Sequence, residues 1–123
     1  MRLNYSIVLV REMNRSVSFY RDVIGLNLRF QSPVWTEFAT EGATVALHLV
    51  EDQGKEETGP VRERAGSCRP GLSVPNLTEF HARMLAMNVR CVQEPEQRFG
   101  SRIAQYLDPD GLVIAVSEAK QMG

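Results

Sequence analysis

The chain has little cysteine, little net charge and no long hydrophobic run. Its 123 residues include two cysteines, with 14 basic residues against 15 acidic ones, so the net charge is −1. Cys68 and Cys91 show no CxxC spacing, which predicts free thiols in a cytoplasmic protein rather than a disulfide framework. The charges are scattered, and no apolar run approaches the roughly 20 residues of a membrane span. We therefore expect neither nucleic acid nor a membrane as a partner.

Common catalytic signatures are also missing. The sequence has no GxSxG, no P-loop and no GxGxxG, which are the usual signs of α/β-hydrolases, nucleotide phosphatases and dinucleotide-binding folds. The composition is ordinary for a globular protein, at 43% hydrophobic and 24% charged residues. The length favours a single domain spanning residues 1–123.

The hydrophobic pattern divides this domain into two similar halves, module one (1–50) and module two (67–119). Between them, residues 51–66 (EDQGKEETGPVRERAG) are almost wholly polar and predict a solvated loop. Alternating and β-branched patterns predict strands at 3–10, 26–32, 35–40, 44–50, 68–74, 89–94, 102–107 and 112–117. Each half therefore reads strand, helix, strand, strand, strand.

The two helices are predicted from their spacing and end signals. In the first helix, Asn14 or Ser16 is expected to cap the start and Gly25 to end it in a left-handed conformation. The second helix covers 76–88, where Asn76 with Glu79 forms a capping box and Asn88 suits the end.

An internal repeat supports the two-module organisation. Residues 10–13 align with 74–77 at an offset of 64, and 25–26 align with 88–89 at an offset of 63. Residues 46–51 align with 113–118 at an offset of 67, which makes His48 and Ala115 equivalent. Small, drifting offsets fit two copies of one unit.

Several segments, in order along the chain, resemble the vicinal oxygen chelate superfamily, which includes glyoxalase I, bleomycin-resistance proteins and extradiol dioxygenases. They are residues 16–26 (SVSFYRDVIGL), 46–49 (ALHL), Phe99-Gly100 and 107–111 (LDPDG). The resemblance implies an α+β fold of two tandem βαβββ modules forming a curved mixed sheet around a cleft, with one helix per module on the convex side. It also implies mainly antiparallel pairing, a first strand beside the fourth in each module, and a homodimer.

Metal-dependent members of this superfamily place one ligand on the first and one on the last strand of each module. By position, those places here are Tyr5, His48, Arg69 and Ala115. Tyrosine is a poor ligand unless ionised, arginine is a fixed cation and alanine has no donor, whereas a divalent metal needs three or four N, O or S ligands. Exchanging Arg69 for Cys68 still gives only two strong ligands. We expect no metal cofactor, or one centred on His48.

The expected function is binding of a small, planar organic molecule in an aromatic-lined cleft, as in the metal-free, drug-sequestering members. The residues expected to bind it are Tyr5, Trp35, His48, Arg69, Phe99 and Arg102. Three alternatives stay open. One is a metal-dependent lyase or dioxygenase using Ni, Fe, Mn or Zn at His48. Another is a metal-free enzyme with His48 as general base and Tyr5 or Arg69 as oxyanion stabiliser. The last is a subunit or regulatory module without an active cleft.

Overall fold

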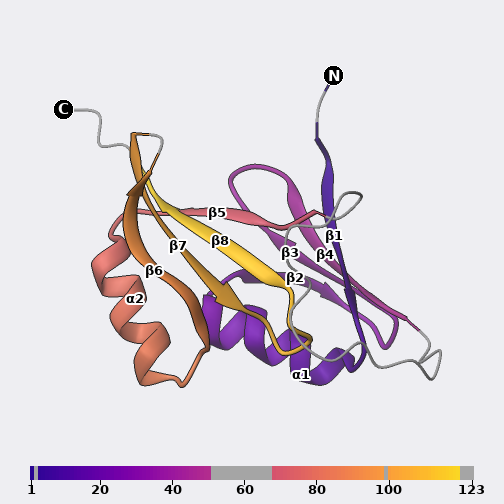
Figure 1. Ribbon diagram of the computed structural model, residues 1–123. Coiled ribbons are helices and arrows are strands. Elements are labelled where there is room, and N and C mark those ends of the chain that lie inside the picture. The colour runs from indigo at the N-terminus through magenta and orange to yellow at the C-terminus, as the bar shows by residue number, and fades with distance from the viewer. Residues whose placement is uncertain (2, 51–67, 99, 120–123) are drawn as a thin grey trace. The chain divides into compact units, whose positions relative to one another are not determined.

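The structure is a computed structural model that describes residues 1, 3–50, 68–98 and 100–119. It contains two compact units, Met1–Thr58 and Gly59–Gly123. Each unit contains one four-stranded sheet with helical structure on one side (Figure 1). The predicted loop 51–66 and Phe99 lie outside the described residues.

The first unit contains a sheet of strand order β1-β4-β3-β2. Its elements are β1 (Tyr5–Val10), α1 (Met13–Ser18), the π-helical segment η1 (Phe19–Ile24), β2 (Asn27–Gln31), β3 (Trp35–Ala39) and β4 (Thr44–Leu49). Strands β1 and β4 run parallel, and the other two pairs are antiparallel.

The second unit repeats this topology with the strand order β5-β8-β7-β6. Its elements are β5 (Gly71–Val74), α2 (Leu77–Ala86), β6 (Cys91–Arg98), β7 (Ser101–Leu107) and β8 (Val113–Glu118). The predicted α+β fold of tandem βαβββ modules is confirmed, including the first strand beside the fourth and the excess of antiparallel pairs.

The first helix starts at Met13, two residues earlier than a cap at Asn14 would place it. Glu12 caps it, accepting hydrogen bonds from the backbone N–H groups of Asn14 (3.2 Å) and Arg15 (2.6 Å). The prediction of Asn14 or Ser16 as the cap was wrong. Both lie inside the helix, and the extended backbone of Glu12 puts its carboxylate within reach of the free N–H groups of the first turn.

The other helix ends follow the predicted signals. Gly25 has a φ of 97° and Asn88 a φ of 58°, so both adopt the left-handed conformation that ends a helix. The Asn76 side chain accepts a hydrogen bond from the backbone N–H of Glu79 at 3.0 Å, as its capping role requires.

Two strands of the second unit differ from their predicted bounds. Strand β5 begins at Gly71 rather than residue 68, because Pro70 has no N–H to donate to a ladder. Strand β6 extends to Arg98 and tolerates Pro95 because the register shifts between Gln93 and Glu96, as at a β-bulge on an edge strand.

Each core lies between the sheet and its helix. The largest fully buried apolar side chains in the first unit are Val10, Val17, Tyr20, Phe38 and Leu47; those in the second are Leu77, Met84, Tyr106, Ile114 and Val116. Cys68 and Cys91 are free thiols, as predicted. None of the described helices has the length and apolar character needed to cross a membrane.

Candidate functional site

The two faces of the first sheet have different roles. One face packs on the helix: Thr36 donates a hydrogen bond to the Met13 sulfur at 3.3 Å, and the Phe38 ring lies 6.3 Å from that of Tyr20. Residues alternate along a strand, so Trp35 and Glu37 point to the other face, the open face. The ladders extend the open face with further residues, namely Tyr5, Ile7, Leu9, Ala46 and His48.

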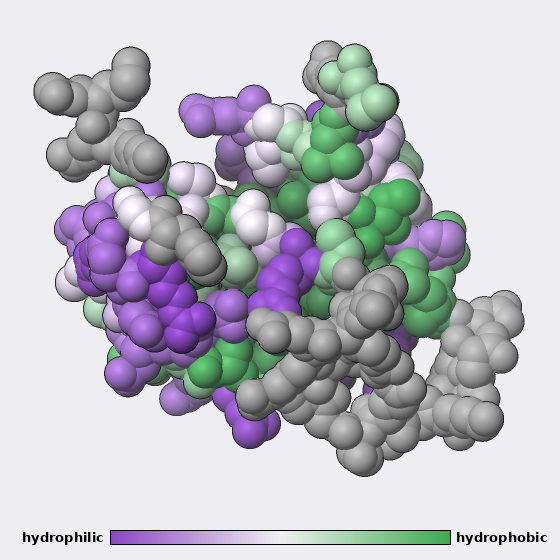
Figure 2. Space-filling view, turned by 45° about the horizontal axis from the view of Figure 1, so that its top comes forward, coloured by the Kyte–Doolittle hydropathy of each residue, from purple (hydrophilic) through white to green (hydrophobic). Residues whose placement is uncertain are grey.

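Three rings form an aromatic group on the open face. The Trp35 ring lies 6.2 Å from Tyr5 and 5.8 Å from His48, both in edge-to-face geometry. Tyr5 is 44% exposed, and Ile7 and Leu9 beside it on β1 are more exposed still. Figure 2 shows hydrophobic residues gathered where β1 runs. An exposed aromatic and aliphatic surface of this kind is typical of a binding site.

A network of hydrogen bonds beside the aromatic group holds the Trp35 indole. Its Nε1–H donates to Glu37 Oε2 at 2.8 Å, and the other carboxylate oxygen accepts from Arg29 Nη2 at 2.9 Å. The same Arg29 nitrogen donates to Thr44 Oγ1 at 2.6 Å, so the network spans three strands. The hydrogen bond from Trp35, followed by that from Arg29, lowers the pKa of the Glu37 carboxyl.

Sequence reasoning left Glu37 undecided and did not single out Arg29. The signal for Glu37 was present, because positions 35 and 37 of one strand share a face. Arg29 gave no such signal, since it lies at an irregularity of β2 between Leu28 and Phe30 where simple alternation fails.

Strand register corrects the predicted equivalence of His48 and Ala115. The two α-helices begin 64 residues apart, at Met13 and Leu77, so Ile7 corresponds to Gly71. Ile7 pairs with Ala46, and Gly71 pairs with Ala115. Ala115 therefore corresponds to Ala46, and the offset of 67 predicted for the last strands is two residues too short.

Tyr5 and His48 are consequently too far apart along the sheet to share one ion. Tyr5 pairs with Thr44, and His48 pairs with Leu9, four positions further along both strands. At a rise of about 3.3 Å per residue, their backbones are separated by roughly 13 Å. Trp35 contacts both rings, whereas metal ligands must converge within about 2.0–2.3 Å of one ion.

The second unit also has an open face, which consists mostly of small and polar residues. The ladders place Gly71, Ser73, Ile103, Gln105, Ala115 and Ser117 on it. Gln93, on the edge strand, donates from Nε2 to the Ile103 carbonyl at 3.1 Å. None of these side chains is aromatic, so the two units offer different chemistry.

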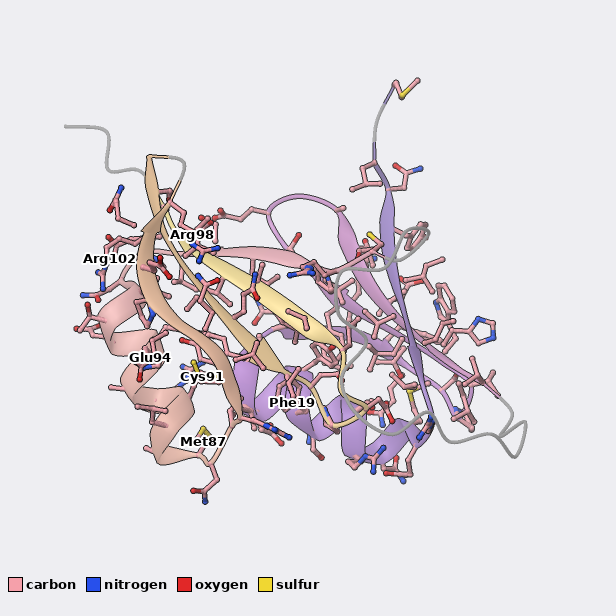
Figure 3. All side chains as sticks on the ribbon, in the orientation of Figure 1. Phe19, Met87, Cys91, Glu94, Arg98 and Arg102 are labelled. Carbon is pink, nitrogen blue, oxygen red and sulfur yellow. The ribbon has the colours of Figure 1, made fainter. Side chains whose placement is uncertain are left out.

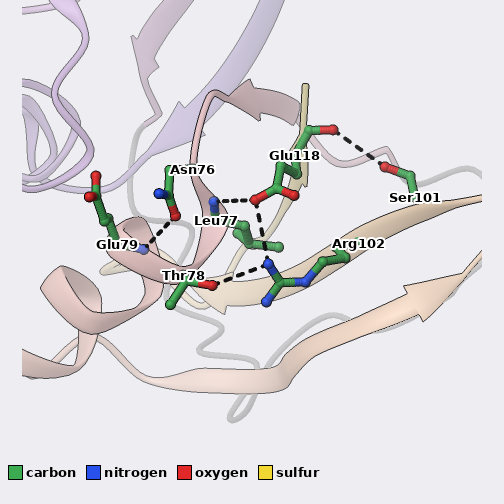
Figure 4. A network of polar contacts seen from close by, with 7 residues as sticks. All are labelled: Asn76, Leu77, Thr78, Glu79, Ser101, Arg102 and Glu118. Carbon is green, nitrogen blue, oxygen red and sulfur yellow. Dashed lines mark hydrogen bonds and ion pairs between the residues drawn. The ribbon is translucent and has the colours of Figure 1, made fainter. Parts of the chain in front are cut away.

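Arg102 lies on the helix-covered face of the second sheet. It alternates with Ile103 and shares its face with Ala104 and Tyr106, and Figure 3 shows its side chain directed towards the side of α2. Its guanidinium donates to Thr78 Oγ1 at 3.1 Å and lies 3.4 Å from Glu118 Oε2 (Figure 4). Arg102 therefore supports the start of α2, on the opposite face from Ala115.

Two residues of the predicted site remain, Arg69 and Phe99. Arg69 is partly exposed and precedes β5 instead of lying within it. Phe99 is not described, but its neighbour Gly100 has a φ of 77°, which suits the tight turn between β6 and β7. Thus only Tyr5, Trp35 and His48 of the predicted set are seen to lie together.

The donor chemistry does not fit the metal that the resemblance implied for related enzymes. Ala46 and Ala115, at matching positions of the two last strands, have no donor atom. Within the described residues, no three His, Cys, Asp or Glu side chains are grouped so that they could hold a metal ion.

A comparison of the sequence with protein families agrees with this architecture. A family model for the Glyoxalase/Bleomycin resistance protein/Dioxygenase superfamily matches residues 2–116. The chain belongs to this superfamily. No curated protein matches the chain.

Solved structures carry the same fold. A protein of unknown function from Agrobacterium tumefaciens str. C58 is 26% identical, with a TM-score of 0.78 and coverage of 98% of this chain and 95% of that one. A glyoxalase/bleomycin resistance protein/dioxygenase family enzyme from Burkholderia phytofirmans PsJN is 16% identical, with a TM-score of 0.76 and coverage of 98% and 100%. A lactoylglutathione lyase from Agrobacterium tumefaciens is 17% identical, with a TM-score of 0.73 and coverage of 98% and 96%.

Proposed function

We propose that this superfamily member binds a small, planar organic molecule on the aromatic group of Tyr5, Trp35 and His48, without the usual metal. The observation that carries the proposal is the contact of the Trp35 ring with both other rings on an exposed face. Aromatic rings bury a large area with little loss of conformational freedom, and they pair favourably with other flat rings.

The surroundings of the group suit a mainly apolar ligand with few polar contacts. Ile7 and Leu9 are 53% and 61% exposed beside it, so a bound ring would remove apolar surface from water. The exposed His48 makes no hydrogen bond with another described residue, which leaves its ring nitrogens available to a polar atom of the ligand. Such a mixture is typical of small-molecule sites.

Two features weigh against a metal as the recognition element. Alanine at both 46 and 115 removes a donor from the last strand of each unit. In addition, the carboxylate nearest to the aromatic group is that of Glu37, and it is already bonded to Arg29 and Trp35. A metal-dependent lyase or dioxygenase centred on His48 remains the second candidate, supported by the free ring nitrogens of that side chain.

Trp35 is the single tryptophan of the chain, so its fluorescence reports directly on this face. Titration with planar compounds such as acridine and lumiflavin is expected to quench it saturably. Calorimetry on Trp35→Phe and Trp35→Ala should then show weaker binding, by about 1 kcal/mol or more for the alanine variant.

Met87→Ala serves as the control for non-specific adsorption, because Met87 is an exposed apolar residue of the second unit at 44% exposure. It should bind like the parent protein. Binding that is equally strong in parent and Trp35→Ala would refute the proposed site, and absence of saturable binding across the planar compounds would refute the proposed function.

A further inference from the structure

The Trp35 indole is bonded to a carboxylate that is in turn bonded to an arginine of the neighbouring strand β2. Glu37, two residues along β3, accepts the indole N–H at 2.8 Å and the Arg29 guanidinium at 2.9 Å. Arg29 on β2 also bonds to Thr44 on β4, at 2.6 Å. The orientation of the indole is therefore coupled to the backbone positions of β2, β3 and β4.

We propose that Glu37 is a positioning residue that fixes the Trp35 ring, and that the ring so fixed recognises a planar aromatic molecule that is neutral or cationic. This inference rests on the proposed function and deepens it. The indole N–H is already bonded to Glu37, so the ligand meets the π face of Trp35 rather than its only hydrogen-bond donor.

The charge preference follows from the pairing of Arg29. A free guanidinium near the rings would attract carboxylates and phosphates. Here Arg29 is matched by Glu37, whose side chain is only 20% exposed, so the pair presents no unbalanced positive charge. The faces of tryptophan and tyrosine rings carry negative quadrupole density, which attracts cations.

The fixed ring also lowers the entropic cost of binding. A side chain immobilised only on binding costs about 0.5–1.5 kcal/mol, which corresponds to roughly a two- to tenfold change in affinity. Loss of the Glu37 carboxylate should therefore weaken binding by about that factor, although Glu37 need not touch the ligand.

The test compares Glu37→Ala and Glu37→Gln in ¹⁵N-labelled protein. The single tryptophan gives a single indole N–H resonance. In Glu37→Ala this resonance should lose its downfield shift and exchange faster with water. Glu37→Gln keeps an oxygen acceptor and should largely restore both properties. Glu41→Ala removes a nearby exposed carboxylate of the β3–β4 connection and should change neither.

Ligand affinity is measured by calorimetry with two probes of one ring system and opposite charge, 9-aminoacridine and acridine-9-carboxylate. The parent should bind the cation at least tenfold more tightly. Glu37→Ala and Glu37→Gln both leave the Arg29 charge unmatched, so both should lose part of the preference for the cation. The positioning effect is the difference between them, and Glu37→Ala should bind the cation about two- to tenfold more weakly than Glu37→Gln.

The outcomes separate the two proposals. Equal affinity for both probes overturns the charge preference. An altered indole resonance in Glu37→Ala, with the same affinity for the cation as Glu37→Gln, overturns the positioning role. If the parent binds neither probe, ligand recognition fails together with the proposed function. In that case the ligand-free indole spectra still decide whether Glu37 holds the ring.

Discussion

Ala46 and Ala115 occupy equivalent places in the two sheets. Ala46 pairs with Ile7 on β1, and Ala115 pairs with Gly71 on β5, in two parallel ladders of the same topology. The duplicated unit thus carries alanine twice where the last strand would present a ligand towards its first strand. His48 corresponds instead to Ser117, two residues further along the strand.

This register predicts negligible metal uptake. Protein stripped with a chelator and offered nickel, iron, manganese or zinc should bind far less than one ion per chain, because too few donors converge. The chain has only one other histidine, His81, so His48→Ala and His81→Ala form a matched pair for metal analysis. Stoichiometric uptake that only His48→Ala abolishes would contradict the prediction and favour the metal-dependent lyase or dioxygenase centred on His48.

A second prediction concerns a buried hydroxyl in α1. Ser16 is fully buried, and its Oγ has no hydrogen-bond partner among the described residues. Because an unsatisfied buried polar group is costly, Ser16→Ala should raise the free energy of unfolding by about 1 kcal/mol in urea titrations. Ser18→Ala, at an exposed position of the same helix, should gain only about 0.5 kcal/mol or less from helix propensity. Destabilisation by Ser16→Ala would show that the hydroxyl has a stabilising contact.

The sequence predicted the element order well because the patterns of strands and helices are local. Gly25 and Asn88 end the two helices because both adopt the left-handed conformation for which they were predicted. The register of β4 and β8 was not accessible in the same way. A shift of two residues keeps every side chain on its own face, so alternation cannot detect it. Only the ladders between distant strands separate His48 from the position equivalent to Ala115.

The candidate site was predictable only in part for a similar reason. Trp35 and His48 lie on adjacent strands, so their proximity follows from the hairpin. Arg102 is different, because alternation along β7 does not say which face meets the helix. Its contact with Thr78 and Glu118 depends on how α2 packs on the sheet. That packing is a tertiary effect without a local signal.

A third prediction follows from the cap that Glu118 provides to α2. Its carboxylate accepts the Leu77 backbone N–H at 2.9 Å. Glu118→Ala should lower the free energy of unfolding by about 1 kcal/mol, as expected for a lost helix cap. Glu118→Gln keeps an acceptor and should lose less. Arg102→Ala removes a partly exposed ion pair and should cost only about 0.5 kcal/mol.

Arg102→Ala also tests the position of Arg102 relative to the ligand. Planar-ligand affinity should stay unchanged in this variant, because Arg102 lies on the helix-covered face. Glu96→Ala, which breaks the exposed pair with Arg98, is the control for a general loss of charge on this hairpin. A selective loss of affinity in Arg102→Ala would place its guanidinium at the ligand.

The last prediction concerns alkaline stability and Tyr106. This fully buried ring lies in the second core, and its hydroxyl is 2.9 Å from His81 Nδ1. Burial, followed by the nearby Cys91, raises the pKa of Tyr106 well above its ordinary value. The unfolded chain ionises this tyrosine from about pH 10 while the folded chain keeps the proton. Stability from this group is therefore complete below pH 10 and is lost as the pH rises further.

Urea titrations from pH 7 to 11 measure this loss, best in a Cys91→Ala background. Burial also raises the pKa of Cys91, so its thiol would cause a similar loss that begins at lower pH. Tyr106→Phe should flatten the alkaline fall in unfolding free energy. At pH 7 it should cost about 1 kcal/mol, because His81 loses a partner. Tyr5→Phe, at an exposed site, should keep the alkaline fall. An equally steep fall in Tyr106→Phe would show that another group controls alkaline unfolding.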